Sequence, residues 1–228
     1  MKTLRLLFVL FAFNTTNALA QWEMGLDMGA IVPVGTLAES SFPLGIGGDL
    51  VFMSPTILNP ESDLKVQFGL NLGAGDNGRK SFKTNSQFEE GSLGFYNCIV
   101  THQVSTRLTY RPHPHFGMFT EALAGLTRVH SGINETTNTK KVTGSSHTKV
   151  YSMRSFRYGG GIGASYYFNN YTRLELRADY TIGGPVKFID MASADITEDG
   201  AIYTGVYSKR SDLVNIQLRI CWSLIPNK

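Results

Sequence analysis

Alternation of apolar and polar side chains runs through most of this chain, and it is clearest between Tyr171 and Gly183. One row of that segment is apolar, and the other row carries four charges: Arg173, Glu175, Arg177 and Asp179. Because successive side chains of a strand point to opposite faces, the segment predicts a strand with one apolar and one charged face. A strand of a membrane-spanning β-barrel has an apolar outer face and tolerates a polar inner face.

Seven other segments alternate in the same way. With the first, they are Trp22–Val32, Leu44–Phe52, Leu64–Gly73, Tyr96–Tyr110, Phe116–Arg128, Phe156–Phe168, Tyr171–Gly183 and Val214–Leu224. Most are about twice as long as the usual strand of ~5–6 residues, and a tilted strand of about 12 residues crosses the apolar layer of a bilayer. Eight is an even number that suits a closed antiparallel ring. The pattern therefore predicts an all-β fold, an eight-stranded antiparallel up-and-down transmembrane β-barrel.

Five of the seven connections between these segments are either short or long, whereas residues 33–43 and 54–63 are of middling length. Asn169-Asn170 reads as a two-residue hairpin turn and residues 111–115 as another short turn. The connections after the third, fifth and seventh segments are much longer and polar. Short turns at one end and long loops at the other are typical of outer-membrane barrels, so we expect periplasmic termini and extracellular long loops. Residues 75–91 and 131–153 read as exposed, mobile loops.

Aromatic residues on the apolar rows gather towards the two ends of the predicted strands, as in the girdles of membrane barrels. The set near the periplasmic end is Trp22, Phe52, Tyr110, Phe116, Phe168, Tyr171 and Trp222. The set near the outer end is Tyr96, Phe156 and Tyr158. A soluble lipocalin-type barrel, with its apolar row inside, also alternates. Its strands need not be this long, and its exterior would be weakened by the many glycines on the polar rows.

Charges on the polar rows are balanced, with six acids and six bases. They are Glu23, Asp27, Asp49, Lys65, Arg107, Glu121, Arg157, Arg173, Glu175, Arg177, Asp179 and Arg219. Buried charges are tolerated when they are paired and hydrogen-bonded, and an eight-stranded barrel is just wide enough for side chains to fill. The pattern predicts a lumen plugged and cross-braced by ion pairs. The alternative is that several of these residues lie unpaired in wet vestibules.

The first twenty residues have the features of a secretory signal peptide. Lys2 and Arg5 precede the apolar run 6–13, and Ala18-Leu19-Ala20 forms a small-residue cleavage site. We therefore expect residues 1–20 to be removed and residues 21–228 to form the barrel in the bacterial outer membrane. No later segment resembles a transmembrane helix.

The net charge argues against a nucleic-acid partner, and the positions of the two cysteines argue against a disulfide. The formal net charge is +3, and two of these positive charges, Lys2 and Arg5, belong to the expected signal peptide. The chain that remains is close to neutral, which argues against a nucleic-acid partner. Cys98 falls on an apolar row and Cys221 on a polar row, so we expect two free thiols rather than a disulfide.

Isolated candidates for chemistry have simpler interpretations. His113 and His115 flank Pro114 in a turn without a third metal ligand, and the acidic last loop matches no EF-hand spacing. His102 falls on an apolar row in mid-strand, with no Ser two residues away. We expect a local bulge to turn it inward. Phosphate-binding loops and nucleophile elbows are absent from the sequence. We therefore expect no catalytic, cofactor-binding or metal-binding residue.

Three segments carry a resemblance to a known family: residues 22–29 (WEMGLDMG), 119–125 (FTEALAG) and 159–168 (GGGIGASYYF). They resemble the small outer-membrane β-barrel domain common in Bacteroidetes, which is similar to the OmpA transmembrane domain. The resemblance implies an eight-stranded barrel inserted by the outer-membrane assembly machinery. Unlike many such barrels, the sequence continues beyond Trp222 with six non-aromatic residues, and it carries no peptidoglycan-binding domain.

These observations favour a non-enzymatic, monomeric outer-membrane barrel with a structural or partner-interaction role through its loops or wall. Its expected contacts are outer-membrane lipid and an envelope protein. One alternative is a narrow, porin-like channel for a small or amphipathic molecule. A more distant alternative is a lipid-modifying outer-membrane enzyme.

Overall fold

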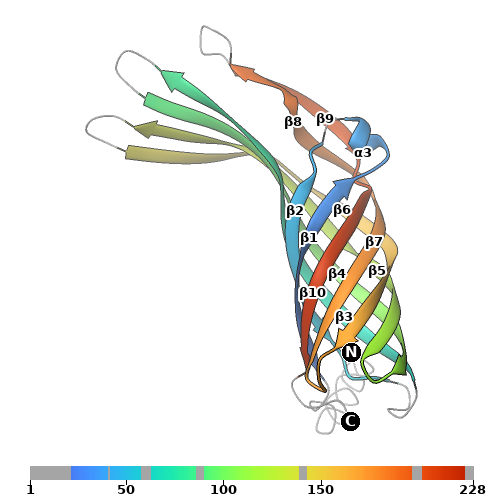
Figure 1. Ribbon diagram of the computed structural model, residues 1–228. Coiled ribbons are helices and arrows are strands. Elements are labelled where there is room, and N and C mark those ends of the chain that lie inside the picture. The colour runs from blue at the N-terminus through green and yellow to red at the C-terminus, as the bar shows by residue number, and fades with distance from the viewer. Residues whose placement is uncertain are drawn as a thin grey trace, which may run out of the picture.

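The computed structural model describes residues 22–40, 42–57, 63–85, 90–138, 143–196 and 202–223. The expected signal peptide lies outside these residues. Eight strands close into one antiparallel ring in the order β1-β10-β7-β6-β5-β4-β3-β2 (Figure 1). The ring strands are β1 (Glu23–Pro33), β2 (Gly45–Met53), β3 (Leu64–Asn85), β4 (Glu90–His113), β5 (Phe116–Asn138), β6 (Thr143–Tyr167), β7 (Thr172–Gly183) and β10 (Leu213–Ser223). The predicted eight-stranded barrel is confirmed.

The wall of the ring presents its apolar row outward. In β7, buried Glu175 and Arg177 alternate with Leu176, which is 59% exposed. Ile162 on β6 and Met28 on β1 are 68% and 70% exposed. Side chains this large and apolar, repeated around the ring, form the surface that contact with lipid acyl chains requires. We call this surface the apolar belt.

The two ends of the ring differ. Glu23 pairs with Ser223, so β1 begins where β10 ends, and we call this side the terminal end. The β6–β7 turn lies there too, where Asn169 Oδ1 accepts hydrogen bonds from the backbone N–H groups of Tyr171 and Thr172 at 2.8 Å each. The opposite side is the loop end. None of the helices among the described residues is long and apolar enough to cross a membrane.

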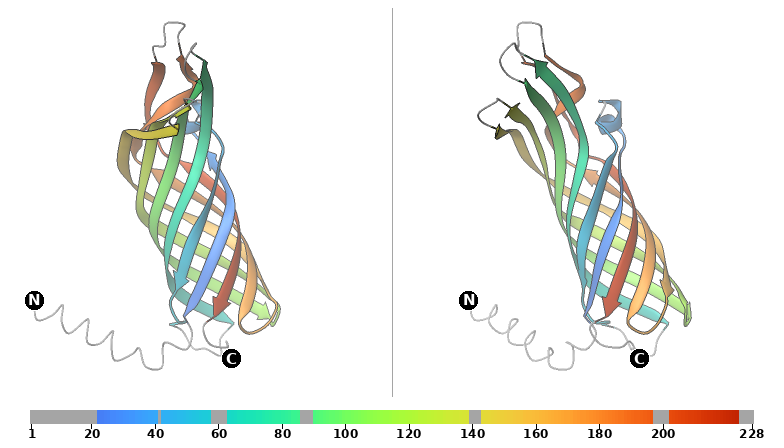
Figure 2. Two further views of the ribbon diagram at one scale, coloured as in Figure 1. Left: turned by 90° about the vertical axis from the view of Figure 1, so that its left-hand side faces the viewer. Right: turned by 60° about the vertical axis from the view of Figure 1, so that its left-hand side comes forward.

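Four strands continue far beyond the ring at the loop end. β3, β4, β5 and β6 are 22 to 25 residues long, about twice the length of β1 or β7, and they curve away from the barrel axis (Figures 1 and 2). The expectation of loops at 75–91 and 131–153 is therefore wrong for the described parts of both segments. We call the parts of β3–β6 beyond the ring the outer sheet.

The connection after β7 also folds. It forms a hairpin of β8 (Pro185–Ile196) and β9 (Ile202–Arg210), which pair antiparallel as a separate two-stranded sheet. The first connection contains α3 (Thr36–Glu39), a single helical turn between β1 and β2. Both elements lie over the loop end of the ring (Figure 1).

Candidate functional site: a charged lumen beneath an apolar cap

The predicted lumen charges lie on the inner face of the ring. Ten of them are buried: Glu23, Asp27, Arg107, Glu121, Arg157, Arg173, Glu175, Arg177, Asp179 and Arg219. The other two, Asp49 and Lys65, are half-buried. The strand period places all of them inward because each belongs to the polar row of its strand.

One continuous chain of ion pairs runs from the terminal end into the middle of the lumen. Arg173 Nη2 lies 2.7 Å from Glu23 Oε2, and Arg173 Nε lies 2.6 Å from Glu175 Oε1. Glu175 also accepts from Arg107, whose Nη1 lies 2.6 Å from Glu175 Oε1. Arg107 then reaches Glu121 Oε1 at 2.6 Å. Glu175 thus lies between two guanidinium groups, which offsets the cost of burying it.

A second set of pairs continues towards the loop end. Arg219 Nη2 lies 2.7 Å from Asp27 Oδ2. Arg177 lies between two acids, with Nε 3.0 Å from Glu121 Oε2 and Nη2 3.2 Å from Asp179 Oδ2. Because Glu121 belongs to both sets, the buried charges form one network rather than separate pairs.

Neutral amides complete this network, and the count of charges alone missed them. Gln217 Nε2 donates to Asp49 Oδ2 at 3.1 Å, and Gln217 Oε1 accepts from Arg177 Nη1 at 2.9 Å. Asn215 Nδ2 donates to Asp179 Oδ1 at 2.8 Å. Their place on the polar row of the last strand was visible in the sequence, but their partners depend on the register of the closed ring.

Two bases stand apart from the network. Arg157 is fully buried, and Nη2 donates to the carbonyl oxygen of Ser211 at 2.8 Å. Lys65 is half-buried near the terminal end. Among the described residues neither base forms an ion pair.

Large apolar side chains share the inner row of β5 with an acid. Phe119 and Leu123 are buried on the same inner row as Glu121. The guanidinium carbon of Arg107 lies 3.9 Å from the centroid of the Phe119 ring, a cation–π contact. A wide apolar side chain on this row therefore shields the Arg107 charge instead of facing lipid.

Little space remains in the lumen. A cavity of about 20 Å³ lies between the charge network and the loop end, which is room for about one water molecule. Its lining mixes polar and apolar residues, with Asp49, Gln103, Arg157, Ile31, Ile99 and Leu213 among them.

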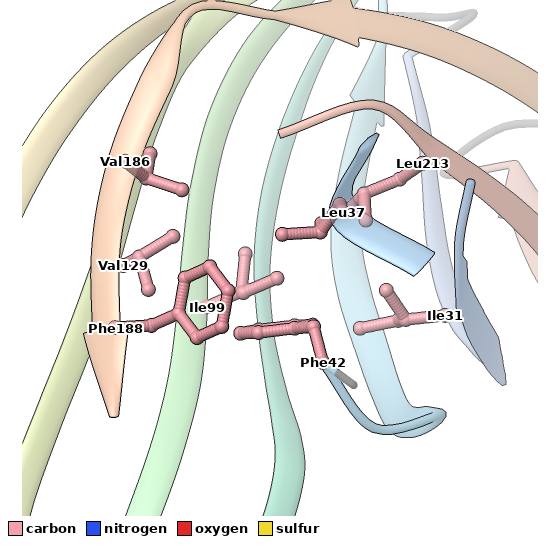
Figure 3. Close-up of a cluster of buried hydrophobic side chains, with 8 residues drawn as sticks. All are labelled: Ile31, Leu37, Phe42, Ile99, Val129, Val186, Phe188 and Leu213. Carbon is pink, nitrogen blue, oxygen red and sulfur yellow. The ribbon is translucent and has the colours of Figure 1, made fainter. Parts of the chain in front are cut away.

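Buried apolar side chains gather above this cavity, and we call them the apolar cap. They are Ile31, Leu37, Phe42, Ile99, Val129, Val186, Phe188 and Leu213 (Figure 3). The rings of Phe42 and Phe188 lie edge-to-face with centroids 4.8 Å apart. Leu37 comes from α3 and Phe188 from β8, so both connections contribute side chains that cover the loop end of the lumen.

A second apolar cluster attaches the β8–β9 hairpin to the outer sheet. Ile189 of β8 packs with Leu93 and Phe95 of β4, all buried. Hydrogen bonds add to it, because Asn97 Nδ2 donates to the Ile189 carbonyl at 2.9 Å and Lys80 Nζ donates to the Ala194 carbonyl at 2.7 Å. The hairpin and the outer sheet therefore form one packed body beyond the ring.

His102 and the two cysteines also had predicted positions. His102 is exposed and pairs with Leu72 and Leu126 in unbroken register, so the expected inward-turning bulge is wrong. The regular pleat keeps it on the outer face. Both cysteines are free, as expected, with Cys221 buried in the lumen and Cys98 half-buried on the other face.

Two further expectations concern the turn histidines and the outer aromatic girdle. The backbone N–H of His115 donates to His113 Nδ1 at 3.2 Å, and His115 Nδ1 lies 3.0 Å from the carbonyl oxygen of Tyr167. Within the described residues no cluster of three metal-binding side chains occurs. Phe156 and Tyr158 are 59% and 53% exposed on the belt, whereas Tyr96 is 9% exposed and stacks on His147. Tyr96 thus belongs to the outer sheet and not to the girdle.

Known structures share this fold. No family model and no curated protein matches the chain. Neisserial surface protein A is 11% identical with a TM-score of 0.51, covering 89% of this chain and 97% of its own. Ail of Yersinia pestis is 13% identical with a TM-score of 0.34, covering 89% and 95%. The outer membrane protease OmpT of Escherichia coli is 9% identical with a TM-score of 0.41, covering 90% and 97%.

The chain thus shares its fold with Neisserial surface protein A, and at 11% identity the likeness extends to the fold alone. The Bacteroidetes-type and OmpA-like affiliation stays a prediction.

Proposed function

We propose that this chain is a monomeric integral barrel of the bacterial outer membrane that has a closed lumen and acts without catalysis, through the surface of its extracellular body. In this orientation the terminal end is periplasmic, and the outer sheet with the β8–β9 hairpin projects from the cell. The apolar belt supports membrane insertion, because apolar side chains this exposed are costly in water.

The observation that carries the closed lumen is its filling. Arg107, Arg177 and Arg219 are at most 1% exposed, and each lies within 4 Å of an acid on a strand that is not its neighbour in the ring. The apolar cap lies over one end of this network, and the cavity between them holds about one water molecule. A solute would have to separate buried ion pairs in order to pass, which costs several kcal/mol for each uncompensated charge.

The extracellular body supports an interaction role. Its hairpin is fixed to the outer sheet by a buried apolar cluster and by side-chain hydrogen bonds. A surface that is ordered before binding loses less conformational freedom when a partner docks. We therefore propose an envelope or extracellular macromolecule as the partner.

Conductance tests the closed lumen. Purified protein in planar bilayers is expected to show no steady conductance, and heat-modifiable migration on SDS gels confirms that the sample is a folded barrel. A steady, reproducible conductance from folded protein would favour the channel. The cavity lined by Arg157 is the feature that would then form part of the pathway.

Photocrosslinking tests the interaction role. A photoreactive residue replaces Tyr207 on the hairpin, and the control replaces Tyr110 near the terminal end; the two side chains are 40% and 47% exposed. Crosslinking in intact cells is expected to give a discrete protein adduct at position 207 and none at 110. Equal labelling at both positions, or no adduct at 207, would contradict a partner-binding extracellular body.

A further inference from the structure

Two arginines lie side by side on the outer surface of β5 and β6. Arg128 and Arg154 are directly opposite each other in the antiparallel register, so their side chains leave the sheet on the same face. Their neighbours Thr127 and Ser155 are buried on the inner face. Arg128 is half-buried and Arg154 is exposed. We call these two residues the arginine pair.

The arginine pair marks the upper edge of the apolar belt. Two residues closer to the ring on the same strands, Leu126 pairs with Phe156, and these side chains are 50% and 59% exposed. Phe156 lies against Tyr158, with ring centroids 6.3 Å apart. Exposed aromatic residues of this kind lie at the level of the lipid headgroups. The next outward side chain on β6 is Arg154, which places the pair at headgroup height.

The surroundings of the pair are cationic. His130 follows Arg128 on the same face, and burial together with the charges of Lys149 and Arg128 lowers the pKa of His130. The nearest acid along this row of residues is Asp76, which pairs with Cys98, itself opposite His130. Asp76 is already bound to Arg79 at 2.6 Å.

Such an arrangement lacks a counter-charge. Like charges directly opposite each other in a sheet are destabilising, and among the described residues no acid forms an ion pair with Arg128 or Arg154. Two guanidinium groups on one face present several N–H donors in a geometry suited to phosphate oxygens. An anion held between them would remove the repulsion.

We propose that Arg128 and Arg154 bind the phosphate of a lipid headgroup in the outer leaflet, with Lys149 adding to the positive field. This inference rests on the membrane insertion proposed above. Membrane lipid is favoured over free phosphate because the pair is continuous with the apolar belt: acyl chains would cover Leu126 and Phe156 while the headgroup reaches the arginines. Basic residues near a membrane surface each contribute about 1 kcal/mol towards anionic lipid.

The test measures lipid binding to the folded barrel in neutral detergent micelles by native mass spectrometry. The probes are short-chain phosphatidic acid, phosphatidylcholine with the same chains, and inorganic phosphate. The variants are Arg128→Gln with Arg154→Gln, the same positions changed to Lys, and Lys83→Gln as a control that removes an exposed positive charge elsewhere on the outer sheet.

We expect the native barrel to retain phosphatidic acid preferentially and the double glutamine variant to bind it on the order of tenfold more weakly. Lys83→Gln should match the native barrel, and the double lysine variant should recover part of the affinity. Equal retention of phosphatidic acid by the native and double glutamine forms would overturn the proposal, as would inorganic phosphate binding as tightly as the lipid. Flotation with vesicles measures membrane insertion separately from lipid preference. A barrel that inserts but shows no preference for phosphatidic acid would contradict the lipid site and leave the proposed function standing.

Discussion

Arg107 Nη1 lies 2.6 Å from Glu175 Oε1, and this pair connects β4 to β7 across the lumen. The two strands are not neighbours, because β5 and β6 separate them in the ring. Glu175 also lies 2.6 Å from Arg173 and 3.5 Å from Arg219. One carboxylate therefore lies within 4 Å of three guanidinium groups, and we expect its loss to destabilise the barrel more than the loss of an exposed pair.

Replacing Glu175 with Gln should destabilise the barrel by about 3–5 kcal/mol, because three buried arginines lose a shared counter-charge. The free energy of unfolding is measured from urea titrations of tryptophan fluorescence in lipid vesicles. The matched control is Asp76→Asn, which breaks the Arg79–Asp76 pair of equal length, 2.6 Å, but with side chains 69% and 43% exposed. This control should cost at most about 1 kcal/mol. Similar losses for both variants would show that the lumen network does not stabilise the fold.

Two glycines of β6 should differ in how much stability they lose when replaced by alanine. A Cβ at Gly163 would lie 2.2 Å from Phe119 Cζ and 2.6 Å from the Leu176 carbonyl oxygen, so Gly163→Ala should cost about 1–3 kcal/mol. A Cβ at Gly160 points outward, and its nearest neighbour is the Glu121 carbonyl oxygen at 3.1 Å. Gly160→Ala should be close to neutral in the same urea titration. A larger loss at Gly160 than at Gly163 would contradict the packing of Phe119 over Arg107.

Thiol labelling checks the orientation. A membrane-impermeant maleimide should modify Cys98 on intact cells, and slowly, because burial first and then the charge of Asp76 raise the pKa of its thiol. Cys221 should react only after unfolding, since it is buried in the lumen. Cys98→Ser is the control that leaves Cys221 alone. Labelling of Cys98 only after the outer membrane is permeabilised would reverse the proposed orientation.

The alternating pattern predicted the ring because the two-residue period of a strand determines which side chains face inward, whatever the neighbouring strand is. It placed Arg107 and Glu175 in the lumen for that reason. Their contact could not be foreseen, because it depends on how far each strand is shifted along the next when the ring closes.

The outer sheet was missed for a different reason. The polar residues of 75–91 and 131–153 resemble loops, but Leu93 and Phe95 keep an inward apolar row against the hairpin. In the outer sheet these apolar side chains point inward, whereas within the ring the apolar side chains point outward. Alternation from Leu93 to Ile99 was the available signal. Phe42 and Phe188 gave none, since single aromatic residues in connections do not indicate a shared cluster.

His130 should titrate with a midpoint below the ordinary value of ~6.5, because burial and the charges of Lys149 and Arg128 lower its pKa. NMR of the imidazole in neutral micelles measures it. Arg128→Gln should raise the midpoint, whereas Lys83→Gln should leave it unchanged. With a lowered folded-state pKa, the stabilising contribution is present above the unfolded value and is lost as pH falls through the folded value. No change in Arg128→Gln would show that the two side chains are not electrostatically coupled.

The acids of β1 pair with arginines that come much later in the chain. Glu23 binds Arg173 and Asp27 binds Arg219, partners that are 150 and 192 residues away. Until β10 pairs with β1, an open sheet would hold these acids beside lipid without counter-charges. Closure of the seam and neutralisation of the interior are therefore one cooperative step. A chain that lacks its last strand, or that closes in the wrong register, would leave the buried Asp27 carboxylate without the Arg219 guanidinium.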